Sequence, residues 1–427
     1  MDMKIRLFAR LTLTLLVSAL LLTACNDKDN KPKDDITPNN DTTQTEDAGS
    51  DKNNTNTEVE YNIPLVKSIN VTDETPGDYY GIYALSDGYF KAATQDFTVG
   101  IINSNGEVIM PCEYITLRDI CDNVTAVRDD MGMWSYFNVE SRKFLVEKQD
   151  SMFDFSEGIG CYFDGKEYKY INPDGTPAFE GKFFEAAAFS DGLSRVLTDD
   201  AFGYIDKSGK IVIHCDYQHF DDFHEGLARI SDGKNMGYLN KDGEPEFFMD
   251  CSGIFNYKDG LAAFTTGTKI GYIDKDGRVA AEPLYDRPAQ KDDAFYAFEC
   301  GVAPVMKDGK YGFINRDGEL VIDAIYDLVS CAKDGIIRVK KDNLFGFITV
   351  KGEIIADCIY TEAGYFCDGV ASVMKDGKYY FINKNGEEIT SERFDDTTDF
   401  CNGTAFVVKD GTYTWYKVTL GEVIKEK

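Results

Sequence analysis

The sequence predicts an all-β protein, a tandem array of about ten repeats of about 34 residues that each fold as a three-stranded β-meander. The first observation is a recurring segment, which reads "GYID" at residues 203–206 and "GFIN" at residues 312–315. The second is a Gly that usually follows an acidic or amide residue, and it recurs in the same rhythm from residue 88 to residue 403. Two markers that share one period indicate copies of a single unit.

The first marker fixes the length of the unit. Successive copies lie 34 or 35 residues apart, except for one interval of 41 residues. The marker position is occupied by Gly100, Ser135, Lys169, Gly203, Gly237, Gly271, Gly312, Gly346, Tyr380 and Thr414. A functional loop that was used twice would not recur this often, so the chain is an array.

A third observation is a turn glycine six residues beyond the first marker, in contexts such as "KSG" and "KDG". β-branched and aromatic residues flank it, which is typical of a tight hairpin whose Gly adopts a positive φ. These predicted structural glycines are Gly106, Gly175, Gly209, Gly243, Gly277, Gly318, Gly352 and Gly386. A second turn, such as "SDGK" at residues 231–234, joins two further strands, so each unit forms a meander like "LARIS", "MGYLN" and "KIVIH".

The strand that carries the first marker is predicted to be apolar on both faces. Phe202 and Tyr204 lie on one face, and Gly203 and Ile205 lie on the other. Such a strand is expected between two neighbouring units, and we expect the Gly to admit a bulky side chain from the next unit. The units therefore stack on one another.

The two ends of the array carry incomplete units. Residues 80–95 supply one strand of a unit, and residues 412–427 supply the other two. The ends could pair to close a propeller-like ring, or each could cap an open array. Ten units is a high number for a ring, so an open, curved array is the favoured prediction.

Residues 1–24 resemble a bacterial lipoprotein signal. Lys4, Arg6 and Arg10 precede the apolar run "LTLTLLVSALLL" at residues 11–22, and the segment ends in Leu22-Thr23-Ala24-Cys25. Cys25 is the expected site of lipid attachment, because several acyl chains on one residue anchor a protein stably. Residues 25–60 are predicted to be the lipidated cysteine and a disordered tether, and residues 61–427 the repeat domain. The expected location is the bacterial cell envelope, outside the cytoplasm.

The net charge of −29 argues against nucleic acid as a partner. Eleven cysteines would suggest disulfides in an exported protein. However, Cys121, Cys367 and Cys401 occupy one repeat position and Cys112, Cys215 and Cys358 another, so pairing between most of them is geometrically awkward. A small buried apolar role is expected for them. We find no Gly-rich phosphate loop, nucleophile elbow or zinc-protease motif, and no cofactor is predicted.

Two segments stand out from the repeat. The only histidines, His214, His219 and His224, lie within "HCDYQHFDDFH" beside several acidic residues, which makes them weak candidates for a metal site. Their spacing matches no standard ligand motif, so loop decoration is the favoured interpretation and no metal is predicted. The interval of 41 residues comes from extra residues within 285–301, either a binding loop or a tolerated insertion.

The repeat resembles the WG-repeat family of β-repeat proteins. "FGYIDKSGKIVI" at residues 202–213 and "FHEGLARI" at residues 223–230 are close to the family pattern, and the resemblance covers about residues 80–427. The Trp of that pattern is replaced, for example by Phe202 and Tyr311. The resemblance implies a binding or scaffolding surface without shared catalytic residues.

These observations together predict a lipid-anchored, non-catalytic binding or scaffolding module for a protein partner. One alternative is a glycan-binding surface lipoprotein, which exposed aromatic residues in successive units would support. The other is a metal-dependent receptor or enzyme that uses the loop from His214 to His224. Metal content after gentle purification would distinguish this last alternative from a binding module.

Overall fold

The computed structural model describes residues 63–424 except residues 200, 218, 289–292 and 413. The expectations for residues 1–61, including the lipid site at Cys25, lie outside the described residues. The described part is almost entirely strand and turn, and it forms one compact unit that begins at residue 62. None of its helices has the length and apolarity needed to span a bilayer.

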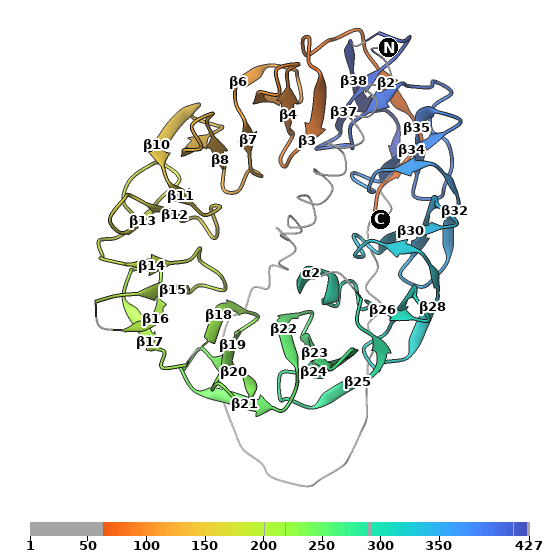
Figure 1. The fold of residues 1–427 in the computed structure, drawn as a ribbon. Helices are drawn as coiled ribbons and strands as arrows, with labels where there is room; N and C mark the ends of the chain where they lie inside the picture. The colour runs from red at the N-terminus through yellow and green to blue at the C-terminus, as the bar shows by residue number, and fades with distance from the viewer. Residues whose placement is uncertain (1–62, 200, 218, 289–292, 413, 425–427) are drawn as a thin grey trace, which may run out of the picture. The chain divides into compact units, whose positions relative to one another are not determined.

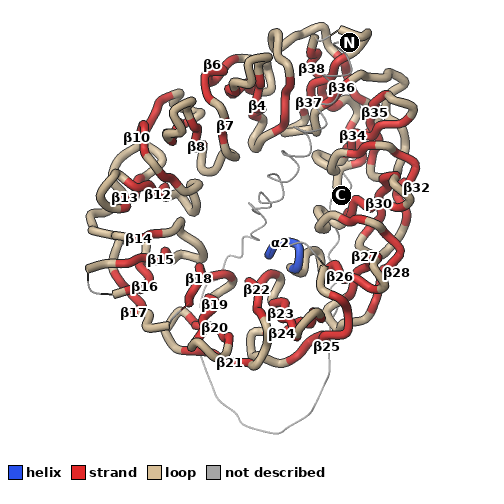
Figure 2. The backbone as a smooth tube through the Cα atoms, in the orientation of Figure 1, coloured by secondary structure: helices blue, strands red, loops and turns tan. Residues whose placement is uncertain are grey.

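The predicted all-β repeat fold is confirmed. Small antiparallel sheets, here called blades, follow one another along the chain and are arranged around a ring (Figures 1 and 2). The first strand of each complete blade is the innermost and the last is the outermost (Figure 1). Blades 1 to 10 span residues 81–114, 116–149, 151–171, 185–214, 219–249, 253–286, 303–326, 328–360, 362–383 and 396–420.

The strands have the following bounds. Blades 1 to 5 contain β3 (Gly81–Ala84), β4 (Tyr89–Ala93), β5 (Val99–Asn103), β6 (Val108–Tyr114), β7 (Thr116–Leu117), β8 (Val124–Arg128), β9 (Trp134–Asn138), β10 (Lys143–Gln149), β11 (Ser151–Met152), β12 (Gly160–Phe163), β13 (Tyr168–Ile171), β14 (Glu185–Ala186), β15 (Ser194–Leu197), β16 (Phe202–Ile205), β17 (Ile211–His214), β18 (His219–His224), β19 (Leu227–Ser231), β20 (Met236–Asn240) and β21 (Pro245–Met249). Blades 6 to 10 contain β22 (Gly253–Lys258), β23 (Leu261–Thr266), β24 (Lys269–Asp274), β25 (Val279–Asp286), β26 (Ala303–Lys307), β27 (Lys310–Ile314), β28 (Leu320–Tyr326), β29 (Leu328–Val329), β30 (Ile336–Lys341), β31 (Leu344–Thr349), β32 (Ile354–Tyr360), β33 (Glu362–Ala363), β34 (Val370–Lys375), β35 (Lys378–Asn383), β36 (Asp396–Thr397), β37 (Thr404–Val408) and β38 (Trp415–Leu420).

Most units have one strand more than the predicted three. A short inner strand precedes the meander, and blade 4 has the order β14-β15-β16-β17. The inner strand is only two residues long in β14, where Glu185 pairs with Leu197 and Ala186 pairs with Val196. So short a strand leaves no alternating pattern in the sequence, and the pairing partner in the same blade is what defines it.

The ring is closed, so the favoured open array is wrong and the alternative arrangement is correct. Near the N-terminal end of the described part, β2 (Ile69–Val71) pairs antiparallel with β38 and completes blade 10. Strand β1 (Leu65–Val66) likewise pairs with β39 (Val423–Ile424). Trp415 donates from Nε1 to the carbonyl oxygen of Tyr79 at 3.1 Å.

Apolar packing explains why the two ends meet. Phe90 of blade 1 and Phe406 of blade 10 are both fully buried, and their rings form an edge-to-face pair with centroids 4.9 Å apart. Trp415 belongs to the same cluster and is 2 % exposed. An open array would leave these end faces in water, and burial of large side chains is worth about 1.5–3 kcal/mol each.

The glycine of the first marker accommodates backbone rather than a neighbour's side chain. A Cβ on Gly203 would lie 2.3 Å from the carbonyl oxygen of Ile213, which belongs to the outer strand β17 of the same blade. The register between β16 and β17 shifts at this point, as in a β-bulge. The expectation that a bulky side chain from the next unit fills the site is therefore wrong, because the bulge brings the outer strand close.

All eight predicted turn glycines have positive φ, between 76° and 85°. Several of them also lie against the preceding blade. A Cβ on Gly209 would lie 2.3 Å from the ring of Phe179, and a Cβ on Gly318 would lie 2.9 Å from Cβ of Ala281. These hairpins therefore form part of the contact between blades.

Acidic residues directly before the Gly of the second marker join successive blades. The carboxylate of Glu157 accepts from the N–H of Gly192 at 3.0 Å and pairs with Nζ of Lys207 at 3.1 Å. The carboxylate of Glu225 does the same with the N–H of Gly260 at 2.9 Å and with Lys275 at 3.2 Å. Repetition of this contact fixes the position of each blade against the next.

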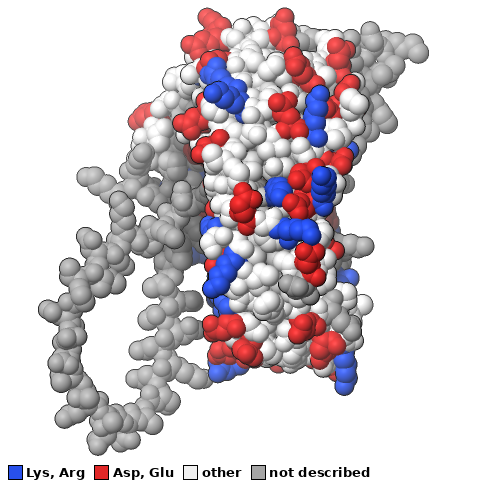
Figure 3. Space-filling view, turned by 90° about the vertical axis from the view of Figure 1, so that its left-hand side faces the viewer, with Lys and Arg blue, Asp and Glu red and all other residues white. Residues whose placement is uncertain are grey.

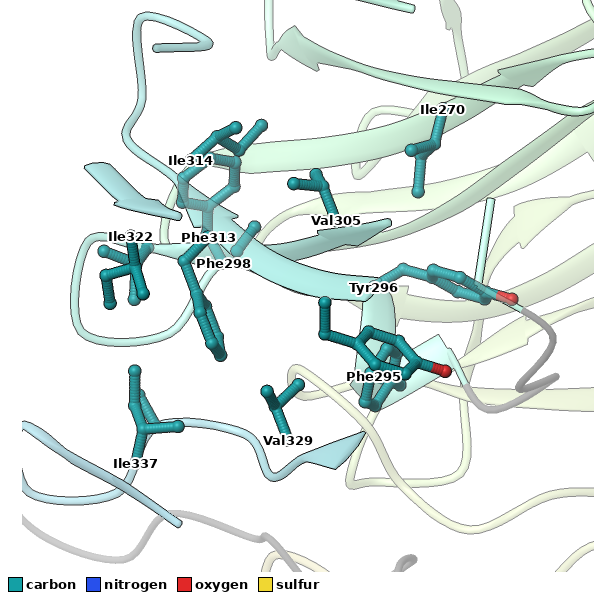
Figure 4. Close-up of a cluster of buried hydrophobic side chains, with 14 of the residues drawn as sticks. Ile270, Phe295, Tyr296, Phe298, Val305, Phe313, Ile314, Ile322, Val329 and Ile337 are labelled. Atoms are coloured by element: carbon teal, nitrogen blue, oxygen red, sulfur yellow. The ribbon is translucent and has the colours of Figure 1, made fainter. Parts of the chain in front are cut away.

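The extra residues of the long repeat turn inward. They include α2 (Asp293–Tyr296), which lies at the inner side of the ring (Figure 1). Phe295, Tyr296 and Phe298 pack in a buried cluster with Phe313 (Figure 4). The segment thus contributes core side chains to blade 7.

Candidate functional site

Three arginines occupy one repeat position on otherwise apolar second strands. Arg195 lies on β15, Arg229 on β19 and Arg338 on β30, each three residues after the second-marker Gly of its unit. Each donates from Nη1 to a carbonyl oxygen in the next blade, at Phe220 (2.9 Å), Ile254 (3.2 Å) and Ala363 (2.6 Å). A cation in such a strand requires partners, and the neighbouring blade supplies them.

The first of these arginines lies at a cleft between two neighbouring blades. This cleft, called cleft A, lies between blades 4 and 5 and has a volume of about 520 Å³. Its lining includes Glu185, Arg195, Phe202, His219, Phe220 and Asp221. The volume falls within the range of about 300–1,000 Å³ that is usual for ligand pockets.

A smaller cleft, called cleft B, repeats the arrangement one blade further on. It has a volume of about 150 Å³, and Arg229, Met236 and Ile254 take the repeat positions of Arg195, Phe202 and Phe220. His219 and Asp221 of β18 line both clefts. β18 is thus a wall shared by two equivalent sites.

The positive charges of the arginines at these clefts lie close to the negative charges of two aspartates. Arg195 lies 3.9 Å from Asp221 Oδ1 and 3.5 Å from Asp222 Oδ1, and Arg229 Nη2 lies 2.9 Å from Asp221 Oδ2. Burial raises the pKa of Asp222, and the positive charge of Arg195 opposes that rise. The two arginines and the two aspartates thus lie close enough to offset one another's charge, while the buried Asp222 Oδ1 accepts no hydrogen bond from the described residues.

Glu185 differs from these groups. Its side chain is exposed, and it has no hydrogen bond or ion pair with any residue in the described part of the chain. Phe202 is 38 % exposed, and its ring packs edge-to-face on that of Phe220 at 5.5 Å. Cleft A therefore presents an unpaired carboxylate beside accessible aromatic surface.

The three histidines do not come together. His214 ends the outer strand β17, where it pairs with Gly203, whereas His219 and His224 lie at opposite ends of the inner strand β18. Within the described ranges, no group of three or more His, Cys, Asp or Glu side chains is arranged to hold a metal ion. Only His219 lines the clefts.

The described cysteines are buried or partly buried, and the residues at the repeat position of Phe202 differ in their exposure. The ten cysteines of the described part form no disulfide, and burial raises the pKa of Cys367 to about 12. Ile270 and Tyr311 occupy the repeat position of Phe202 but are only 1 % and 8 % exposed. A ladder of exposed aromatic residues in successive units, which a glycan-binding surface would use, is not seen over residues 63–424.

Sequence reasoning identified His219 but missed Glu185, Arg195 and Phe202 as neighbours. A signal for Arg195 exists, because "LSRVL" and "LARIS" carry an arginine at one position of an apolar strand in consecutive units. The signal for Glu185 is weaker, because its two-residue strand "EA" recurs at the same repeat position only as Glu362-Ala363 in blade 9. On the side of the molecule in Figure 3, acidic and basic side chains are interspersed, so the net charge gives no guide to the site there.

The chain matches the family described as "WG containing repeat" in six segments. The matched residues are 170–200, 202–235, 270–311, 311–345, 345–379 and 381–413. These segments contain most of blades 4, 7, 8 and 9 and the residues of cleft A, and they leave residues 236–269 of blades 5 and 6 unmatched. Among curated proteins, none matches this chain.

Three solved structures match this chain with low TM-scores. A eukaryotic initiation factor matches with a TM-score of 0.47 and 11 % identity, over 78 % of this chain and 98 % of the other. The computationally designed protein Ika8 matches with a TM-score of 0.35 and 11 % identity, over 76 % and 98 %. BamB from Moraxella catarrhalis matches with a TM-score of 0.28 and 12 % identity, over 84 % and 98 %. With such low scores, we infer nothing about function from these three proteins.

Proposed function

From the WG-containing repeats that this chain carries between residues 170 and 413, we propose that it is a non-catalytic binding module for a protein partner. The observation that carries the proposal is cleft A, where Glu185 and Phe202 are accessible on a rigid frame. Binding residues are often found on loops and edges that a fixed scaffold positions. The closed ring and the contacts between blades would supply that scaffold.

The chemistry of the cleft supports binding more than catalysis. Asp221 is paired with Arg229 at 2.9 Å, and Arg195 is held by the carbonyl oxygen of Phe220. Groups that are tied in this way have their charges already neutralised and their geometry fixed. Such groups favour recognition of a surface over the transfer of protons.

The module is proposed to be held at the bacterial cell envelope through a lipid on Cys25. The polar segment of residues 26–60 would then separate the lipid from the ring. This part of the proposal rests on the sequence of residues 1–60, with its charged start, apolar run and Ala24-Cys25 junction.

Metabolic labelling with a radioactive fatty acid tests the anchor. The wild-type chain is expected to incorporate label, and Cys25→Ala is expected to incorporate none and to remain uncleaved or soluble. Equal labelling of the two proteins would contradict the assignment of Cys25.

Site-specific crosslinking in intact cells tests the binding function. A photoreactive p-benzoylphenylalanine replaces His219, which lines both clefts, or Met131, which is 81 % exposed in blade 2. We expect a discrete protein adduct from position 219 and none from position 131. No adduct at position 219, or the same adduct at both positions, would overturn the proposal.

A further inference from the structure

We infer that cleft A receives a basic side chain, lysine or arginine, presented by the protein partner. The inference rests on the proposed binding function and adds the chemistry of what is bound. Three features of the cleft lead to it: an unpaired carboxylate, an accessible aromatic ring, and a floor whose charges are already balanced.

The balance of charge determines the sign of the ligand. Arg195 is held by the carbonyl oxygen of Phe220 and lies within 3.5–3.9 Å of two aspartates, so it has little attraction left for an anion. Asp221 is in turn paired with Arg229. Glu185 remains as one uncompensated negative charge at the cleft, which favours a ligand group with one positive charge.

The aromatic surface favours a cation that carries an apolar stem. Phe202 is 38 % exposed at the cleft, and the face of an aromatic ring attracts ammonium and guanidinium groups. The methylene chains of lysine and arginine pack on apolar surface while the charged end reaches a carboxylate. This chain already shows such an arrangement, since the guanidinium of Arg195 lies 5.6 Å from the ring centroid of Phe220.

Comparison with cleft B indicates which residues would confer the preference. The position of Glu185 in cleft A is taken by His219 in cleft B, and that of Phe202 is taken by Met236. Both clefts keep the arginine and its carbonyl partner in the next blade. Of the two clefts, only cleft A has this carboxylate and this aromatic ring, whereas the arginine is common to both. Glu362 and Tyr379 repeat the pair in blade 9, but there the tyrosine hydroxyl donates to the carboxylate, which is therefore already paired.

Calorimetric titration of the full chain in detergent tests the inference. The probes are an acetylated hexapeptide of alternating Gly and Lys, the same peptide with Glu in place of Lys, and free spermidine. We expect the lysine peptide to bind more tightly than the glutamate peptide and spermidine. If spermidine binds as tightly as the lysine peptide, the inference that the cation belongs to a protein side chain is wrong.

The variant Glu185→Gln keeps the shape of the side chain and removes its charge. It is expected to weaken binding of the lysine peptide by about fivefold to tenfold, as loss of a charge-assisted contact does. Glu282→Gln is the matched control, because Glu282 is an exposed carboxylate on β25, outside both clefts. An equal loss in both variants, or no loss in Glu185→Gln, would show that cleft A is not the site.

The outcomes separate this inference from the proposed function. If the adduct at position 219 forms and Glu185→Gln does not reduce it, the chain binds a protein through the clefts, but the inference that cleft A receives a basic side chain is wrong. If binding of the lysine peptide depends on Glu185 while no adduct forms at position 219, cleft A recognises cations, but the proposal that the chain binds a protein partner is wrong.

Discussion

The buried tyrosines of the first marker connect neighbouring blades residue by residue. Tyr204 is fully buried, and its hydroxyl donates to the carbonyl oxygen of Asp221 at 2.6 Å. Tyr238 makes the equivalent contact with Phe255 at 2.6 Å. Tyr272 occupies the same repeat position, but its buried hydroxyl has no hydrogen-bond partner among the described residues. The same residue type therefore has different energetic roles in different blades.

This difference predicts unequal effects of Tyr→Phe substitution. Tyr204→Phe is expected to lower the free energy of unfolding by about 1–2 kcal/mol, because it leaves a buried carbonyl unsatisfied. Tyr272→Phe is expected to change it by less than about 0.5 kcal/mol, since it removes a hydroxyl without a partner. Urea unfolding of the two variants measures this, and equal losses would contradict the assigned contacts.

Burial of these hydroxyls also predicts sensitivity to alkali. Burial raises the pKa of Tyr136, Tyr170, Tyr204 and Tyr272 above the usual value near 10. Above about pH 10 the unfolded chain releases these protons and the folded protein keeps them, so stability falls as the pH rises. At pH 11 each tyrosine contributes a loss of about 1.4 kcal/mol.

Urea unfolding at pH 8 and pH 11 measures this loss. Lysines also titrate in this range, so the control is the double variant Tyr170→Phe with Tyr204→Phe, which should lose less stability between the two pH values than the wild-type protein does. An equal loss would show that the tyrosines are not responsible.

At the scale of the element, the two turns of each unit have different neighbours. Gly192 of the second marker and Gly209 of the hairpin turn after the first marker have nearly equal φ, 83° and 82°. A Cβ on Gly192 would meet no atom within 4 Å, whereas a Cβ on Gly209 would meet the ring of Phe179 at 2.3 Å. One turn needs only a backbone conformation, and the other needs space as well.

Alanine at these two positions should separate the two requirements. Gly192→Ala is expected to cost about 1 kcal/mol of stability, the strain of a positive φ. Gly209→Ala is expected to cost about 2–4 kcal/mol, because displacement of the Phe179 ring adds to that strain. Denaturant unfolding compares them, and a similar cost at both positions would argue against contact between the hairpin and the preceding blade.

At the scale of the whole molecule, closure makes distant parts of the sequence interdependent. Strand β2 supplies Val71, which pairs with Val418 of β38 more than 300 residues away. Asn383 also donates to the carbonyl oxygen of Val66 at 3.0 Å. The N-terminal strands therefore hold blades 9 and 10, and through them the ring.

A carboxylate at the closure should loosen both ends of the chain. In Val71→Asp, we expect faster hydrogen exchange in residues 81–114 and in residues 396–420, because the charged side chain disrupts the packing of the closing blade. Blade 5, at residues 219–249, serves as the internal control and should change least. Unchanged exchange in β38 would indicate that β2 does not complete blade 10.

Local chemistry in the sequence determined the repeat unit. The glycines at Gly209 and Gly318 marked hairpins because a positive φ is a requirement of a few consecutive residues. Alternation around Gly203 likewise placed Tyr204 within the contact between units. The all-β class, the unit length and the positions of the turns follow from such short-range constraints.

Only the tertiary structure decided the closure and the clefts. Whether ten blades close into a ring depends on the small rotation between each pair of neighbouring blades. This rotation accumulates over contacts such as that of Glu157 with Gly192, so no single segment of the sequence determines it. Cleft A joins Glu185, Phe202 and His219 from three strands of two blades. Their proximity depends on how one sheet packs against the next, because spacing along the chain specifies the strand that a residue occupies but not the neighbour that it faces across the interface.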